Sequence, residues 1–188
     1  MDTVIDGVDY GPLACLIGMW RGDKGLDIAP EPDGQEVNPY HETILFEAIG
    51  DVTNAEKQVL TGLRYHQVVT RQSTGLVFHN ETGYWMWDAK TGIVFQTLTI
   101  PRGVSLVAGG PYQPNEAGDT TILEVKAASG DSDWGIVEAP FMRSKATTKS
   151  FEHRIEVDGN TMAYTESTVV DIYGKTFNHT DENSLKRD

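Results

Sequence analysis

The chain has 188 residues, of which 39% are hydrophobic, and a formal net charge of -13. This length suits one domain with its own core, over residues 1–188, with residues 1–10 as a lead-in and 173–188 as a C-terminal segment. The acidic balance argues against nucleic acid and membrane surfaces as partners, because both attract basic protein surfaces.

The chain lacks the marks of an exported or membrane-spanning protein. No apolar run approaches the roughly 18 residues of a membrane span, and the N-terminus lacks the basic and apolar regions of a signal peptide. Cys15 is the single cysteine and lies in the apolar run of residues 13–17, which favours a small buried hydrophobe over a nucleophile. These features predict a cytoplasmic, reducing location.

Alternation of apolar and polar residues predicts strands along most of the chain. A short helical turn with proline at its first position is expected at residues 12–17, followed by a strand around Trp20. Residues 29–39 are rich in proline and turn formers and are predicted as a loop. Further strands are predicted at residues 40–49, 58–70, 76–87, 93–100, 104–108, 120–128, 147–157 and 162–172.

Short turns connect these strands. Residues 89–92 form a four-residue hairpin loop, and Asp158-Gly159-Asn160 is the tightest hairpin signal in the chain. Residues 129–145 show no regular pattern. About ten strands joined in this way indicate an all-β protein, either an antiparallel up-and-down β-barrel or a sandwich. A barrel of this width can enclose a cavity for a small molecule.

Common enzyme motifs are absent from the sequence. The chain lacks GxxxxGK[ST], a GxGxxG between strand and helix, HExxH and GxSxG. A lone cysteine and five scattered histidines also give no paired ligands at zinc spacing. Nucleotide binding and hydrolysis by these routes are therefore not expected.

The five histidines remain as candidates for chemistry. His41 and His66 share faces with polar residues and are predicted to be exposed. His153 lies on the apolar face of its strand and is predicted to be a core histidine with satisfied nitrogens. His79 and His179 could serve as axial ligands of a haem iron, but spacing alone does not single them out.

Close spacing of Gly18, Trp20, Gly22 and Gly25 suggests a strand that closes over a core. Two interpretations of Trp20 are open. The tryptophan is either a plug that fills the core under a bend or the floor of a ligand cavity.

Four segments together resemble the nitrobindin family, whose members are compact antiparallel β-barrels that hold haem b and are similar to lipocalin-like fatty-acid-binding proteins. The family patterns GxWxGxG, YxExIxF, MHAESGY and DGxLxY resemble residues 18–25 (GMWRGDKG), 40–46 (YHETILF), 78–84 (FHNETGY) and 158–164 (DGNTMAY). Two places depart from the family: Gly25 comes one residue late, and His179 is followed by Thr180 and Asp181 where the family has apolar residues.

The resemblance implies a compact antiparallel β-barrel with haem b. His179 would be the metal-binding proximal ligand and His79 would lie on the open distal side, with Phe78 and Trp20 as further cofactor-binding residues. In this family such an iron binds nitric oxide and is associated with isomerising peroxynitrite to nitrate, so the chain would be a peroxynitrite isomerase only with haem bound.

Three basic side chains are candidates for the haem propionates by charge alone: Arg64, Arg102 and Lys145. Two other functions stay open. The chain could be a non-haem intracellular carrier of a fatty acid or other small hydrophobic ligand, or a barrel without ligand that Trp20, Trp85 and Trp87 fill. The oligomeric state, including a homodimer, is also open.

Overall fold

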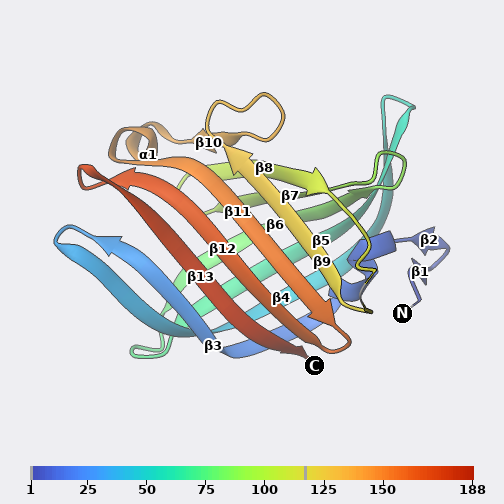
Figure 1. Cartoon of the computed structure of the whole chain (residues 1–188), viewed down its shortest axis with the longest axis horizontal. Coiled ribbons are helices and arrows are strands. Elements are labelled where there is room, and N and C mark those ends of the chain that lie inside the picture. The colour runs from blue at the N-terminus through green and yellow to red at the C-terminus, as the bar shows by residue number, and fades with distance from the viewer. Residues whose placement is uncertain (1, 117) are drawn as a thin grey trace.

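The computed structural model describes residues 2–116 and 118–188, in which ten strands form a closed antiparallel barrel (Figure 1). This confirms the predicted all-β class, the barrel and the strand number. The strands are β3 (Gly18–Glu31), β4 (Gly34–Asn54), β5 (Gln58–Arg71), β6 (Val77–Asp88), β7 (Ile93–Ile100), β8 (Val104–Pro111), β9 (Thr121–Ala128), β11 (Ala146–Asp158), β12 (Thr161–Ile172) and β13 (Lys175–Arg187).

Around the barrel the strand order is β8-β7-β6-β5-β4-β3-β13-β12-β11-β9. The pair formed by Gly109 of β8 and Lys126 of β9 closes the ring. Because β13 completes the barrel between β3 and β12, residues 175–187 are a structural strand.

Smaller elements flank the barrel. A hairpin of β1 (Val4–Ile5) and β2 (Val8–Asp9) leads into the 3₁₀ helix η1 (Gly11–Leu16), which confirms the predicted helical turn. Residues 129–145, which showed no pattern, contain β10 (Ile136–Glu138), paired with β8, and α1 (Pro140–Lys145). Within the described ranges, neither helix has the length or the apolar character needed to cross a membrane.

The prediction of a loop at residues 29–39 is wrong. Strand β3 continues to Glu31 and β4 starts at Gly34, so two residues turn the chain. Pro30 lies opposite Gln35 beside this turn, where losing one N–H removes little from the ladder. The predicted turns at residues 89–92 and 159–160 are confirmed.

A β-bulge between Gly22 and Gly25 accounts for the late glycine of the first motif. Gly25 packs under the ring of Tyr40, and a Cβ at position 25 would lie 2.0 Å from that ring. Glycine is therefore required where the bulged strand passes this aromatic side chain.

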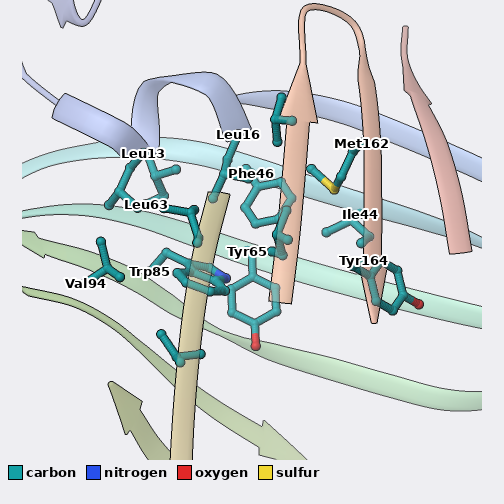
Figure 2. Packing of buried hydrophobic residues seen from close by; sticks show 14 of the residues in the cluster. Leu13, Leu16, Ile44, Phe46, Leu63, Tyr65, Trp85, Val94, Met162 and Tyr164 are labelled. Atoms are coloured by element: carbon teal, nitrogen blue, oxygen red, sulfur yellow. The ribbon is translucent and has the colours of Figure 1, made fainter. Parts of the chain in front are cut away.

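The two ends of the barrel differ, and we call them the base and the mouth. The base holds η1 and the turns after β4, β6 and β11, whereas the mouth holds the turns after β3, β5, β7 and β12 (Figure 1). Side chains from η1 and the surrounding strands fill the base (Figure 2). They include Leu13, Leu16, Phe46, Leu63 and Trp85.

Trp20 belongs to this core at the base and is fully buried. Its indole Nε1 donates a hydrogen bond to the Leu16 carbonyl over 2.6 Å, and the Arg187 guanidinium lies 4.5 Å from the centre of its ring. Trp20 is thus held by an apolar shell, one hydrogen bond and one cation–π contact, as a core plug requires.

Candidate functional site

A row of polar side chains crosses the inner face of the barrel near the mouth. The cross-strand register runs from β4 to β11 through Asn38, Asp27, Asp181, Glu166 and His153. Residues directly opposite on antiparallel strands lie about 5 Å apart, and like charges at such positions destabilise a sheet. The three neighbouring carboxylates of this row are therefore an arrangement that packing alone does not favour.

His179 lies two residues before Asp181, on the same face of β13. Its Nε2 donates to Asp27 Oδ1 over 2.6 Å and lies 3.4 Å from Asp181 Oδ2. Asn38 Nδ2 donates to the other Asp27 oxygen over 2.6 Å. One nitrogen and two carboxylate oxygens, from three residues, lie within 4.8 Å of one another.

The charges of this cluster influence one another. Burial is the largest single influence on His179 and Asp27 and works against their charged forms. Their mutual hydrogen bond and the surrounding hydrogen bonds and charges together outweigh it, so the pKa of His179 is raised and the pKa of Asp27 is lowered. Burial raises the pKa of Asp181 to about 6, since the nearby His179 offsets only part of its effect. The shifts of His179 and Asp27 thus both favour the charged form of this pair.

Glu42 lies deeper in the barrel, with 3% of its surface exposed. Its carboxylate accepts hydrogen bonds from Gln67 Nε2 at 2.7 Å, Asn183 Nδ2 at 2.7 Å and the Tyr164 hydroxyl at 3.1 Å. Burial nevertheless raises its pKa to about 7, because these donors compensate only part of the lost hydration.

A second chain of polar groups starts on β6. His79 Nε2 lies 3.4 Å from one oxygen of Glu81, and the Tyr65 hydroxyl donates to the other. Gln96 Nε2 donates to Tyr65 over 2.8 Å, and its Oε1 accepts from His153 Nδ1 over 3.0 Å. A hydrogen-bonded path therefore leads from the mouth into the core.

His153 is buried, as predicted, but one of its nitrogens is not satisfied. Within the described part of the chain, Nε2 has no hydrogen-bond partner, and burial lowers the pKa of His153 to about 4. Glu166 likewise accepts no hydrogen bond from any described residue, and its nearest basic atom is His153 Nδ1 at 4.0 Å. Burial, together with the charges of Glu81 and Asp181, raises the pKa of Glu166 well above its ordinary value.

A cavity of about 50 Å³ lies between these groups. Its walls include Asp27, Asp181 and Glu166 on one side and His79 and Arg102 on the other. A further cavity of about 10 Å³ lies in the apolar part below. The cavity between these groups is therefore small, polar and mainly acidic, and a larger, open depression of about 700 Å³ also borders on Glu166 and Asp181.

The mouth cavity does not fit haem. Pockets that enclose a drug-sized ligand measure roughly 300–1,000 Å³, and the porphyrin is a large flat ligand. The Nε2 of His179 is held by Asp27, and a macrocycle beside it would cover Asp181 and Glu166 with apolar surface. Removing carboxylates from water without a partner is costly, so the side chains present oppose a porphyrin at this position.

Of the four predicted cofactor-binding residues, Phe78 and His79 line the mouth cavity, and His179 contacts Asp27 and Asp181 of its wall. The Phe78 ring packs edge-on against Tyr40, with 6.3 Å between ring centres. Trp20 lies at the base instead and does not line this cavity.

The three candidate propionate partners are dispersed. Arg102 lines the mouth cavity and donates to the Phe78 carbonyl over 3.2 Å. Arg64 is exposed and pairs with Glu47, and Lys145 ends α1 on the surface. The exposure predicted for His41 and His66 is confirmed.

Sequence reasoning missed the carboxylates of the mouth: Asp27, Glu42, Glu81, Glu166 and Asp181. A signal for some of them was present. Glu42 occupies an inward position between Tyr40 and Ile44, where strand alternation places a core residue. An acid in an inward position of an amphipathic strand is the pattern that could have identified the site.

Comparisons with known proteins agree with this architecture. The family described as THAP4-like, heme-binding beta-barrel domain matches residues 9–187. Among solved structures, the crystal structure of Rv2717c from M. tuberculosis is similar, with a TM-score of 0.69, 23% sequence identity and 94% of each chain covered. No curated protein matches the chain. Since the family match spans nearly all of the barrel, the chain belongs to the THAP4-like haem-binding β-barrel domain family.

Proposed function

We propose that this chain, although it belongs to the haem-binding family, binds a small cation rather than haem at the mouth of the barrel. The observation that carries the proposal is the cluster of Asp27, His179 and Asp181, in which two carboxylates face the same histidine nitrogen. Family membership fixes the scaffold, whereas the side chains decide the ligand.

Charge supports this proposal. Asp181 and Glu166 face one another across β13 and β12, and among the described residues neither accepts a hydrogen bond within normal distance. His179 is the basic group in contact with Asp27 and Asp181. A cation in this space would relieve the repulsion between the carboxylates and keep their oxygens partnered.

A carrier of fatty acids or similar hydrophobic ligands is supported less well. The mouth cavity measures about 50 Å³ and the apolar cavity below it about 10 Å³, so a long acyl chain would need the core to open. The carboxylates at the mouth would also repel a fatty-acid headgroup.

Family membership favours a second candidate function. In it, haem b would bind with His179 as axial ligand and His79 on the open side, and the iron would bind nitric oxide and isomerise peroxynitrite to nitrate. This function requires His179 to leave Asp27 and the carboxylates of the mouth to move aside.

Hemin titration separates the two candidates. For the wild-type protein we expect no stoichiometric Soret band that depends on His179. The double variant Asp27→Leu with Asp181→Leu removes the charges beside Nε2, and we expect it to bind hemin more tightly than the wild type. A stoichiometric wild-type band that is lost in His179→Ala but kept in His66→Ala would overturn the proposal.

Thermal unfolding tests the positive half of the proposal. The wild-type protein is heated with millimolar Zn²⁺, Mn²⁺ or methylammonium, and with sodium as the reference. At least one of these cations should raise the midpoint in the wild type and not in Asp181→Asn, since a ligand that binds the native state stabilises it. An unchanged midpoint with all three cations would contradict cation binding.

A further inference from the structure

We infer that the cation of this site is a divalent transition-metal ion, bound by Asp27 Oδ1, His179 Nε2 and Asp181 Oδ2. The inference rests on the proposed function and names its ligand class. It starts from the three atoms that lie within 4.8 Å of one another.

The spacing of these atoms is close to that of a metal site. With bonds of about 2.0–2.1 Å, neighbouring ligand atoms of a tetrahedral zinc ion lie about 3.3 Å apart. The distance from His179 Nε2 to Asp181 Oδ2 is 3.4 Å. The distance from Nε2 to Asp27 Oδ1 is 2.6 Å, so a shift of roughly 1 Å or less would make room for the ion in place of the bridging proton.

The barrel holds these ligands on rigid elements. Asp27 and Asp181 are direct cross-strand partners on β3 and β13, and His179 lies two residues before Asp181 on the same face of β13. Asn38 on β4 donates to Asp27 Oδ2 and leaves Oδ1 directed at His179. Outer partners of this kind orient metal ligands and raise metal affinity.

The adjacent cavity supplies a separate indication of a ligand. It borders on Asp27 and Asp181 and measures about 50 Å³, against roughly 10–15 Å³ for one water molecule on the same scale. This volume suits the waters that complete the coordination of an ion with three protein ligands. A proton shared by His179 and Asp27 would not fill that space, and it would leave the Glu166 carboxylate without a partner.

The donor set selects the class of metal. One imidazole and two carboxylates suit Zn²⁺, Mn²⁺, Fe²⁺ and Co²⁺, whereas Ca²⁺ and Mg²⁺ prefer oxygen ligands alone. Copper(I) favours thiolate and thioether ligands, and neither lines this cavity. We therefore expect selectivity for Zn²⁺ or a neighbouring ion over Mg²⁺.

Calorimetric titration of the metal-free full chain with Zn²⁺ tests the inference. We expect one ion per chain, at least tenfold weaker binding in Asp181→Asn and in His179→Ala, and wild-type binding in His66→Ala, which removes an exposed histidine instead. Mg²⁺ at the same concentration should not bind. Circular dichroism of each variant checks that the barrel is folded.

The absorption of Co²⁺ provides a second readout. It would not change if Asp181 had a structural role alone. The visible absorption of bound Co²⁺ reports its coordination, so the band of the wild type should change in Asp181→Asn and persist in His66→Ala. The inference is overturned if Zn²⁺, Mn²⁺ and Co²⁺ all fail to bind, or if they bind equally well to Asp181→Asn and His179→Ala. If methylammonium stabilises the wild type and no metal ion does, the inference of a metal ion is wrong, but the proposed binding of a small cation stands. A His179-dependent hemin band would instead overturn both.

Discussion

The base and the mouth of this barrel are similarly buried and chemically opposite. At the base, Trp20 and Leu16 are fully buried in an apolar core, whereas at the mouth Asp27 and Glu42 are each only 3% exposed. The same strands supply both ends, since β4 passes from Glu42 at the mouth to Ile44 and the core. Alternation alone therefore brings side chains inside, and buried acids, which lower stability, distinguish the mouth, where we propose the functional site.

The largest expected effect comes from the base. Replacing Trp20 by alanine removes a fully buried indole, its hydrogen bond to Leu16 and its contact with Arg187. We expect a loss of about 4 kcal/mol in the free energy of unfolding, measured by urea denaturation. Phe141→Ala, at an aromatic residue 71% exposed, is the matched control and should change it by less than about 0.5 kcal/mol. Equal effects of the two changes would remove the distinction between core and surface.

The mouth should make stability depend on pH. Burial raises the folded-state pKa of Glu42 from 4.5 to about 7, so its contribution to stability is complete below pH 4.5 and is lost as the pH rises through 7. We expect the free energy of unfolding to fall by about 3 kcal/mol over this range from Glu42 alone. Urea denaturation between pH 4.5 and 8 should show a smaller decrease in Glu42→Gln and an unchanged one in Glu47→Gln. A wild-type slope retained in Glu42→Gln would refute the assignment.

A smaller effect of opposite sign is expected from Glu166. Its carboxylate lies opposite Asp181 and accepts no hydrogen bond from the described residues, so a neutral amide should fit the metal-free protein better. Glu166→Gln should therefore raise the free energy of unfolding by roughly 1–2 kcal/mol at pH 8 without added metal. Glu47→Gln, which removes an exposed carboxylate paired with Arg64, should change it by less than about 0.5 kcal/mol. A lower free energy of unfolding in Glu166→Gln would mean that Glu166 stabilises the metal-free barrel.

Local patterns sufficed to predict most of the fold. Alternation from Phe151 to Val157 and the Asp158-Gly159 turn define the β11–β12 hairpin, because both depend on neighbours in sequence. Residues 29–39 were predicted as a loop because Pro30 and Pro39 outweighed the pattern, although both lie in the ladder between β3 and β4. Residues 175–187 showed little apolar alternation, since the inward positions between Phe177 and Leu185 hold the polar residues His179, Asp181 and Asn183.

The site was predicted only in part, for a physical reason. His79, Phe78 and His179 followed from the family resemblance; the first two line the mouth cavity, and His179 contacts its Asp27 wall. Asp27 and Asp181 become neighbours only when β3 and β13 pair, because they lie 154 positions apart in sequence. A single sequence does not contain that register, so it places Asp181 near His179 but does not reveal the approach of Asp27.

Anomalous diffraction from crystals grown with Zn²⁺ tests the central claim most directly, because it locates the ion without relying on any variant. The account predicts one strong zinc peak at the mouth, about 2.0–2.2 Å from Asp27 Oδ1, His179 Nε2 and Asp181 Oδ2. Zinc found only at the exposed His41 and His66, with the Asp27–His179 hydrogen bond intact, would contradict it.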